Sequence, residues 1–435
     1  MKSHPPVVVA VAALGALACT DHQDLTSVHA AGAQDAAASD VSEVGVGSTA
    51  VTLVAQSRTG TVWERPLPWV GFRDGEDGPW QLVPREAGRY AFQATTGRYT
   101  LVFVCGTFVR VIQAAVAELS HIAANDCFWD NSVPKYALSG GVRGFAGDRG
   151  WVDFVSSGGF GRGDIKDRRY TVEIPRATYE VAALEIVDPV TIGVTGTRLL
   201  RLQSFTFDGS GELDLDFADA TTFVRRPLPL DGLRPCETVQ ASVQLRSPGG
   251  LDLTVGHIDR AGTHIGALRS ADLRPGDQQV LFVSTGGVFP VRGTTLLVEG
   301  DELPPVVLPP AFVSQVVSPK AERLRATVSF QPFPGASYYE LKPIVPWRGT
   351  GFSWLVQVSV GWLSGRTSFE LPDLSNAPGF ESTWLPDPNT DLHIVRALAT
   401  DVDLERLLAC TLWNPTVSGL RYSEETHAPR ATVGP

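Results

Sequence analysis

The chain has 435 residues and a net charge of -11. This charge, with no basic stripe to offset it, argues against nucleic acid as a partner and against simple electrostatic attachment to anionic lipid. A chain of this length is expected to form about three or four domains of roughly 100 to 150 residues each. Glycine and proline are spread among valine, threonine and aromatic residues, so we expect an all-β protein of short strands joined by turns.

The N-terminus predicts an export signal, assigned to residues 1–18. Met1-Lys2 supplies a basic start, Val7 to Ala18 is an unbroken run of apolar and small residues, and Cys19 follows it. A run of this length is too short to span a bilayer as a mature helix, which is typical of a signal peptide. The sequence therefore indicates a protein that leaves the cytoplasm.

The segment Leu14 to Cys19 resembles the bacterial lipoprotein signal, in which the cysteine is lipidated and becomes the new first residue. The resemblance implies a lipid anchor on Cys19, and Thr20 directly after it implies an outer-membrane or surface destination. Ala16 and Ala18 also form an acceptable site for ordinary signal peptidase, which would release an unlipidated, secreted protein. We expect a membrane partner held through the lipid, with secretion as the alternative.

Residues 19–48 are expected to be a flexible acidic tether, because this segment lacks aromatic residues and any apolar period. A first β-sandwich domain is predicted over residues 49–129. Its short β-prone runs are separated by turn clusters and comprise Thr52–Ala55, Trp69–Phe72, Arg89–Phe92 and Tyr99–Cys105. The next apolar segment, Val109 to Val116, is also predicted as a strand because it begins with β-branched residues.

Two features of the first domain are candidate sites. Trp63, Trp69 and Trp80 crowd a turn-rich region, and an exposed indole could stack on a sugar ring, so these three are candidate ligand contacts. Asp74, Glu76 and Asp77 form an acidic turn that could hold calcium weakly, because calcium takes six to eight oxygen ligands. The alternative, which we favour, is an ordinary solvated turn.

The five cysteines fit an oxidising compartment. Cys105 ends a strand-like run and Cys127 follows the next apolar segment, so we predict a local disulfide between them. Cys236 and Cys410 would pair if the third and last domains touch. They would otherwise be two buried thiols.

A tyrosine repeat links the first domain to the second, predicted over residues 130–230. Tyr90 and Tyr99 begin two β-prone runs nine positions apart, and Tyr170 and Tyr179 do the same at the same offset. Each pair predicts a hairpin whose aromatic residues point inward.

The second domain resembles the carboxypeptidase-regulatory, transthyretin-like β-sandwich. Gly141–Gly144 looks like its G-x-V-x-G strand, and Tyr170–Pro175 with Thr178–Val181 looks like its hairpin, although Ala177 stands where the family usually has glycine. The resemblance implies an accessory or binding sandwich without peptidase residues. Ser157–Gly163 is rich in glycine but follows no P-loop pattern, so we expect a loop there.

A third β domain is predicted over residues 231–310, with a hairpin around Ser247–Gly250 and a stiff proline-rich linker at Glu302–Pro310. A fourth domain over residues 311–415 resembles a fibronectin type III sandwich. That resemblance rests on Ala326–Phe330 and Gly335–Leu341 in the places of strands B and C. Residues 416–435 are expected to be a C-terminal tail.

Trp354 to Trp362 alternates apolar and polar residues, so it predicts a core strand. No nucleophile or metalloprotease motif occurs in the sequence. His257 and His264 flank a turn but lack the further ligands that zinc requires. We therefore expect no catalytic residue, no metal site and no cofactor.

These observations predict tandem immunoglobulin-like and transthyretin-like β-sandwiches. The function we infer from them is that of a non-enzymatic, lipid-anchored cell-envelope protein whose sandwiches display a binding or structural surface. Its partners would be the membrane and a glycan or protein of the envelope. The alternative is a carbohydrate- or peptide-binding accessory protein of a polymer-degrading system.

Overall fold

The chain is almost entirely β, as the sequence predicts. Helical structure is limited, among the described residues, to the single turn α1 (Val360–Leu363), the 3-10 turns η1 (Phe217–Asp219), η2 (Ser270–Asp272) and η3 (Ser382–Trp384), and the single residue Leu404. No helix in the described part of the chain is long and apolar enough to cross a membrane. The computed structural model describes residues 48–56, 62, 65–125, 134–147, 149–156, 159–186, 196–209, 211–235, 237–258, 262–286, 290–318, 326–344, 352–385, 392–400, 404, 419–427 and 430–431.

Two layers of strands form the first sandwich, residues 49–125. One layer is a sheet of β4 (Arg85–Glu86), β5 (Arg89–Ala94), β1 (Thr49–Gln56) and β8 (His121–Asn125), in that order. The other layer contains β7 (Phe108–Ala115), β6 (Arg98–Cys105), β2 (Trp69–Asp74) and β3 (Gln81–Leu82). Leu53, Phe92 and Tyr99 are among the side chains that fill the first core between these layers.

Strand β6 is buried on both faces, which explains why it reads as an unbroken apolar run and does not alternate. Leu101 and Phe103 enter the first core, whereas Val102 and Val104 enter a second core shared with the C-terminal part of the chain. The first sandwich therefore carries a second apolar face that only another part of the protein can cover.

The last sandwich, residues 314–431, supplies that cover. One of its sheets has the order β29 (Ser368–Glu370), β26 (Thr327–Phe330), β25 (Ser314–Ser318) and β32 (Arg430–Ala431). The facing strands are β31 (Arg421–His427), β30 (Leu392–Ala399), β27 (Ala336–Ile344) and β28 (Ser353–Ser359). Strands β26 and β27 thus lie in opposite sheets, as the fibronectin resemblance implies for strands B and C.

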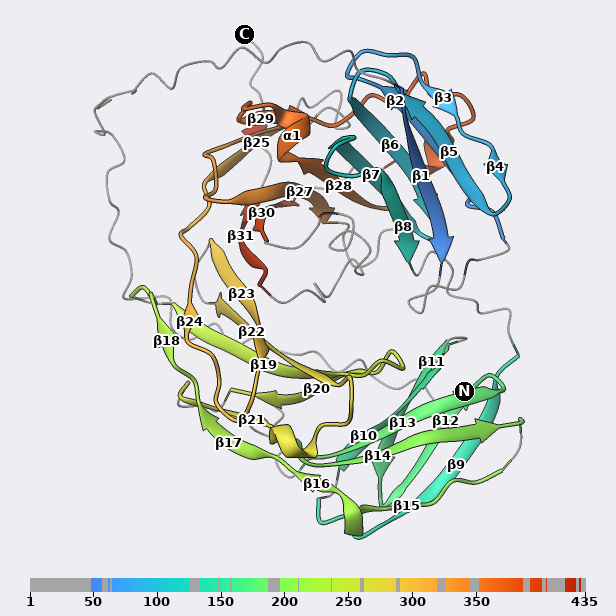
Figure 1. Ribbon diagram of the computed structural model, residues 1–435, viewed down its shortest axis with the longest axis vertical. Coiled ribbons are helices and arrows are strands. Elements are labelled where there is room, and N and C mark those ends of the chain that lie inside the picture. The colour runs from blue at the N-terminus through green and yellow to red at the C-terminus, as the bar shows by residue number, and fades with distance from the viewer. Residues whose placement is uncertain are drawn as a thin grey trace. The chain divides into compact units, whose positions relative to one another are not determined.

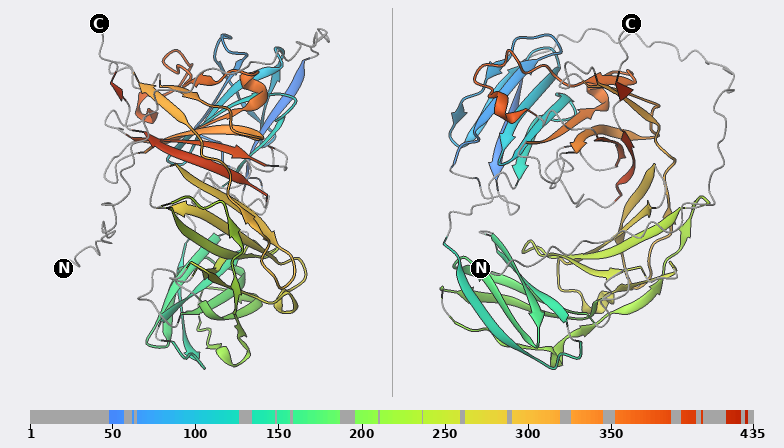
Figure 2. Two further views of the ribbon diagram at one scale, coloured as in Figure 1. Left: turned by 90° about the vertical axis from the view of Figure 1, so that its left-hand side faces the viewer. Right: turned by 180° about the vertical axis from the view of Figure 1, so that it is seen from behind.

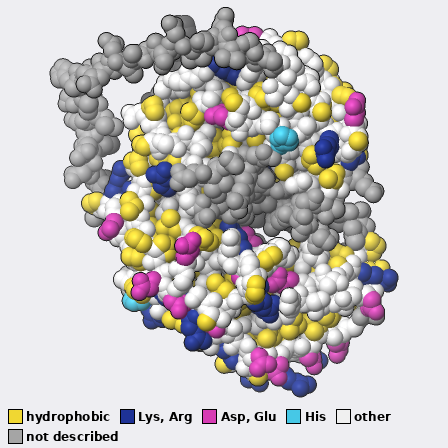
Figure 3. All heavy atoms as spheres, in the orientation of Figure 1, with side chains coloured by type: hydrophobic (Ala, Val, Ile, Leu, Met, Phe, Trp, Pro, Cys, Tyr) yellow, Lys and Arg dark blue, Asp and Glu magenta, His cyan; other side chains and the backbone are white. Residues whose placement is uncertain are grey.

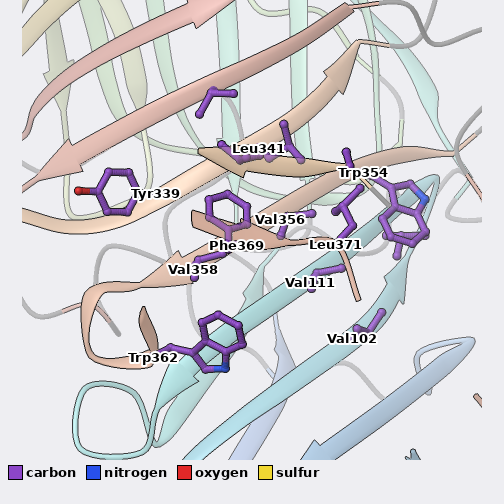
Figure 4. Close-up of a cluster of buried hydrophobic side chains, with 14 of the residues drawn as sticks. Val102, Val111, Tyr339, Leu341, Trp354, Val356, Val358, Trp362, Phe369 and Leu371 are labelled. Carbon is purple, nitrogen blue, oxygen red and sulfur yellow. The ribbon is translucent and has the colours of Figure 1, made fainter. Parts of the chain in front are cut away.

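Parallel pairing joins the first and last sandwiches in one sheet (Figures 1 and 2). In the register of β7 with β28, Val109 lies opposite Trp354 and Val111 lies opposite Val356. The side chains of the second core converge on this seam from both sandwiches, as Figure 4 shows for Val102 and Val111 beside Val356 and Phe369.

The second module, residues 136–222, is an eight-stranded sheet around its own core. Phe154 lies near the centre of that core, between Tyr170 and Tyr179 at ring distances of 6.1 and 6.0 Å. The strand order is β15 (Leu215–Asp216), β9 (Tyr136–Arg143), β12 (Arg169–Ile174), β11 (Gly159–Lys166), β10 (Arg149–Ser156), β13 (Ala177–Ile186), β14 (Gly196–Phe207) and β16 (Thr221–Thr222).

The third module, residues 224–308, packs against the back of β13 and β14, where Ala182, Leu184 and Leu199 join its core. Its β23 pairs with β31, so the twelve-stranded sheet runs on into the last sandwich. The strands of this module are β19 (Thr238–Arg246), β20 (Asp252–His257), β22 (Gln278–Gly286) and β23 (Val291–Val298), with the ribbons β17 (Val224–Pro227) and β21 (His264–Ala267), and β18 (Leu230–Asp231) and β24 (Val306–Val307).

A buried charge cluster ties the second and third modules together. Arg201 on β14 forms ion pairs with Glu180 on β13 and with Asp277 of the third module. The side chains are 7%, 11% and 1% exposed, so water screens these pairs little. Losing one member would leave a buried charge without its counterpart.

Both predicted tyrosine hairpins are wrong. β5 and β6 belong to different sheets, and β11 and β10 lie between β12 and β13 in the sheet order. The tyrosines do point inward: Tyr99 contacts Phe92 at a ring distance of 5.6 Å in the first core, and Tyr170 and Tyr179 both contact Phe154 in the core of the second module. Between β5 and β6 the chain therefore crosses from one sheet of the first sandwich to the other.

Three further expectations need correction. The proposed stiff linker Glu302–Pro310 contributes Leu303, Val306 and Leu308 to the third core. The proposed C-terminal tail contains β31, which pairs with strands on both sides. The alternating run from Trp354 ends as a strand at Ser359, whose side chain caps α1, although Trp354 and Trp362 are both buried as expected.

The predicted hairpin around Ser247–Gly250 is confirmed, because β19 and β20 pair antiparallel on either side of it. The domain limits at 129–130, 230–231 and 310–311 stay predictions. The signal peptide and all of the tether except Ser48 lie outside the described residues.

Candidate functional site

Trp69 is a core residue and presents no face to a ligand. Its side chain is 4% exposed, its ring lies edge-on to Phe380 at 5.1 Å, and its Nε1 donates to the Pro378 carbonyl at 2.9 Å. An indole buried in this way contributes packing and one satisfied hydrogen bond. It joins the first sandwich to the last.

Trp80 is half-buried beside the same seam. Its Nε1 donates to the Asp373 carbonyl at 2.8 Å, and the Arg73 guanidinium lies over its ring at 5.0 Å. Trp63, the third candidate contact, lies outside the described residues. Of the predicted trio, Trp80 is thus the described residue that retains partial exposure.

In the acidic turn, the carboxylates of Asp74 and Glu76 bind groups of the protein itself. Both Asp74 carboxylate oxygens accept backbone and hydroxyl hydrogen bonds from Thr95 and Thr96. Burial raises the pKa of Asp74, but these hydrogen bonds outweigh it and lower the pKa overall. Glu76 forms ion pairs with Arg366 and Arg98. The turn therefore helps to hold the two sandwiches together.

Of the cysteines predicted to be lipidated or paired, Cys105 is the one that lies among the described residues. Cys105 ends β6 and is 8% exposed. Cys19, Cys127, Cys236 and Cys410 lie outside the described residues, so lipidation and both disulfide pairings stay predictions.

His257 ends β20 and His264 begins β21, so both are strand-end residues. His264 Nδ1 shares a hydrogen bond with the Thr263 hydroxyl, and burial lowers the pKa of His257. No group of three metal-binding side chains occurs among the residues that the structure describes.

Ser314, Glu425 and His427 form a polar cluster that the sequence analysis missed. Ser314 Oγ lies 2.7 Å from His427 Nε2 and 2.8 Å from a Glu425 carboxylate oxygen. That same oxygen also accepts the Ser314 backbone N–H at 2.6 Å and lies 3.4 Å from His427 Nε2. In a catalytic triad the acid would bind the far nitrogen of the histidine. Here all three groups meet at one point and fasten β25 to β31.

A further surface is formed by strands β10 and β11 of the second module and by the start of β12, which pairs with β11 at Arg169 (Figure 1). We call it the β10–β12 face. Its exposed side chains are Arg149 on β10, Phe160, Arg162, Asp164 and Lys166 on β11, and Arg169 on β12, whereas Asp153 is buried and Trp151 and Val155 are partly buried against the third core.

Alternating glycines in β11 explain this surface. Gly161 and Gly163 point inward, where a Cβ would lie 2.2 Å from the Ile174 side chain and 3.0 Å from the Thr171 carbonyl oxygen. Ile165 is the next inward residue and is buried. The charged and aromatic side chains of β11 therefore lie on the outer side of the strand. The expectation of a loop over Ser157–Gly163 is wrong from Gly159 onward.

A fixed guanidinium stands at the centre of the β10–β12 face. Arg162 Nε and Nη2 donate to the two Asp153 carboxylate oxygens at 2.6 and 2.7 Å, which is a bidentate pair. Its guanidinium also lies over Trp151 at 5.1 Å and Phe160 at 5.7 Å. The hydrogen bond to Asp153 raises the pKa of Arg162, so the group stays charged.

Two members of this group reach solvent. The side chain of Phe160 is 50% exposed and that of Arg162 is 44% exposed, whereas Asp153 is fully buried. Burial raises the pKa of Asp153, against the opposing effect of Arg162. The arrangement is suited to binding, because it holds an aromatic ring and a cation in place with a buried counterion. The sequence signal for it was the glycine at every second position.

No known protein family matches the chain, and no curated protein matches it. Among solved structures, a candidate adhesin from Bacteroides ovatus is similar at 11% identity with a TM-score of 0.17. That similarity covers 41% of this chain and 90% of the other. The Bacillus anthracis TIE protein is similar at 9% identity with a TM-score of 0.16, over 59% of this chain and 49% of the other. The function proposed below rests on the residues of this chain.

Proposed function

We propose that this chain is a non-enzymatic, lipid-anchored protein of the cell envelope that displays a binding or structural surface on its β-sandwiches. The observation that carries the proposal is the β10–β12 face, where a buried carboxylate holds Arg162 between two aromatic rings and leaves Phe160 exposed. Exposed aromatic residues held in a rigid frame are typical of recognition surfaces.

Binding is favoured over catalysis by how the reactive side chains are used. Ser314, Glu425 and His427 fasten two strands, and Glu76 and Asp74 fasten a turn. The visible surface in Figure 3 mixes acidic and basic side chains and shows no broad field of one sign. Such a surface suits a soluble body held near a membrane by an anchor and not by its own charge.

The anchor follows from the N-terminal sequence. A lipid on Cys19 would place residues 20–48 between the membrane and the folded body, with the outer membrane or cell surface as the destination. Release as a secreted protein is the alternative.

Mass spectrometry of the mature N-terminus tests the anchor. We expect a diacylated or triacylated Cys19, and Cys19→Ala should move the protein from the membrane fraction to the soluble fraction. An unmodified Cys19 at the mature N-terminus would contradict the anchor.

Surface display is tested by labelling intact cells with a membrane-impermeant maleimide. Lys166→Cys on the outer side of β11 should be labelled, whereas Ile165→Cys, one residue away and 1% exposed in the native protein, should not. If neither variant is labelled on intact cells but Lys166→Cys is labelled in lysates, the protein does not lie at the cell surface.

A carbohydrate- or peptide-binding accessory role is the second candidate, favoured by the exposed ring of Phe160 and the partial exposure of Trp80. Loss of glycan-array binding on Trp80→Ala would support the surface near the seam of the two sandwiches. Loss on Phe160→Ala would support the β10–β12 face.

A further inference from the structure

Three basic side chains stand side by side at one end of the β10–β12 face. Arg149 on β10 lies opposite Lys166 on β11, and Lys166 lies opposite Arg169 on β12. All three are exposed, and none forms an ion pair with any residue that the structure describes. Like charges at directly opposed positions of neighbouring strands destabilise a sheet.

This row is unexpected in a chain with a net charge of -11. The protein has more acidic than basic residues, so an acidic partner for these positions would have been readily available. A row of cations that lowers folding stability and has no anionic partner within the protein is explained by an anionic ligand. The negative groups of that ligand would relieve the repulsion on binding.

Next to the cation row lies the aromatic part of the face. Trp151 pairs with Asp164, and Phe160 and Arg162 follow on β11 toward the other end. An aromatic face carries negative charge density and attracts polarised C–H groups, which line one side of a sugar ring. Arg162 and Asp164 lie within the same surface and can hydrogen-bond hydroxyl groups.

We infer that the β10–β12 face binds an acidic polysaccharide, with a sugar ring on Phe160 and carboxylates on Arg149, Lys166 and Arg169. The inference rests on the proposed function, because it names the ligand class of that same surface. A polymer is favoured because the aromatic part and the cation row follow one another along the strands.

Other occupants fit the surface less well. An extended peptide that adds to a sheet edge is held chiefly through its main chain, so it would leave the cation row without a role. A nucleic acid requires a broad positive field, and Asp164 interrupts this one. A lipid surface would engage the cation row but leave the buried Asp153–Arg162 pair without a role.

The test measures binding of polygalacturonate and of alginate to the full chain by isothermal titration calorimetry. Fully methyl-esterified polygalacturonate serves as the uncharged comparison. Lys166→Gln with Arg169→Gln should weaken binding of the acidic polymers about tenfold, because two exposed charge contacts are lost. The matched control, Lys135→Gln with Arg89→Gln, removes the same charge from exposed positions elsewhere and should bind as the native protein does.

Phe160→Ala should weaken binding of the acidic polymers by roughly threefold to tenfold, as expected for a lost stacking contact. Leu82→Ala, at an equally exposed apolar position of 55% exposure, should leave it unchanged. Without polymer, the Lys166 and Arg169 variant should melt at the native temperature or slightly above it, because the repulsion is gone. That readout separates lost binding from lost folding.

Three results would overturn the inference: no binding of either acidic polymer, equal binding of the esterified polymer, or an equal loss in the control variant. Binding to vesicles of phosphatidylcholine and phosphatidylglycerol that depends on Lys166 and Arg169, without binding to the polymers, would assign the row to lipid and also overturn it. None of these results affects the labelling of Lys166→Cys on intact cells, so the two proposals fail separately.

Discussion

The Nε1 atom of Trp69 donates a hydrogen bond to the carbonyl oxygen of Pro378, 309 positions further along the chain. Around this contact, Trp69 also meets Phe380 and Trp384 at ring distances of 5.1 and 6.4 Å. The first sandwich is therefore completed by residues from the far end of the sequence. Its stability cannot be considered apart from that of the last sandwich.

We predict that a fragment of residues 49–129 does not fold cooperatively on its own. Its outer layer would expose an apolar face that the full chain buries against the last sandwich, and such faces lead to aggregation. Differential scanning calorimetry should show no sharp transition for the fragment. The face consists of Trp69, Val102, Val104, Val109 and Val111.

The control joins residues 49–129 to residues 311–435 through a flexible linker. This protein should melt cooperatively, and Trp69→Ala should destabilise it by about 3 to 5 kcal/mol, the usual cost of removing a buried aromatic residue. A sharp transition in the isolated fragment would show that the shared core is dispensable.

The proposed Cys105–Cys127 disulfide should stabilise the full chain. Closing a loop of this length contributes about 3 kcal/mol in the chain-entropy model. Replacing both cysteines by alanine should therefore lower the melting temperature under oxidising conditions, and reductant should lower that of the native protein by a similar amount. Non-reducing peptide mapping checks the pairing directly, and free thiols at both positions would contradict it.

Glu185 makes the second module sensitive to acid. Burial raises the pKa of its carboxyl, but hydrogen bonds from Arg198 and from the Gly147 and Ala146 N–H groups outweigh burial and lower the pKa to about 2. A pKa below the unfolded value stabilises the folded state above that unfolded value, 4.5, and the stabilisation is lost as the pH falls toward 2.

Glu185→Gln should accordingly reduce the free energy of unfolding at pH 7 by about 3 kcal/mol. The difference from the native protein should shrink between pH 4.5 and pH 2, measured by urea unfolding at each pH. Glu299→Gln, at an exposed position, should change little at any pH. A Glu185→Gln difference that stays constant down to pH 2 would contradict the assignment.

Limited proteolysis should distinguish the two segments that the sequence marks as linkers. The predicted tether, residues 22–48, should be cut first. Residues 302–310 should resist, because Leu303, Val306 and Leu308 are 7%, 1% and 6% exposed and anchor the segment in the third core. Cleavage at both segments at the same rate, followed by mass spectrometry of the products, would refute this.

The sequence predicts local structure well where one face of a strand is buried and the other is wet. The hairpin around Ser247–Gly250 is an example, since Leu245 and Leu253 lie opposite each other in the structure. It also predicts the burial of Trp354 and Trp362. Alternation of apolar and polar residues carries the information in both cases.

What the sequence cannot reveal is which distant segment covers a second buried face. The unbroken run Leu101 to Cys105 signals burial on both sides but does not identify β28 as the neighbour of β7. Prolines in residues 302–310 suggest a linker, but three apolar side chains between them are buried in the third core and fix the segment there. Glycines at 159, 161 and 163 suggest a loop. The strand packs so closely on its neighbour that positions 161 and 163 have no room for inward side chains, so the apolar alternation typical of a strand is missing from the sequence.

The parallel pairing of β7 with β28 also constrains the order of events during folding. A chain that emerges from the ribosome or crosses a membrane with its N-terminus leading shows β7 long before Ser353–Ser359 is available to pair with it. Until then, an apolar face of the first sandwich stays exposed, and exposed apolar surface is what chaperones recognise. Contacts this distant in sequence also form slowly. The closing of this seam is therefore expected to be the last and slowest step of folding, and the step at which a newly made copy is most exposed to proteases.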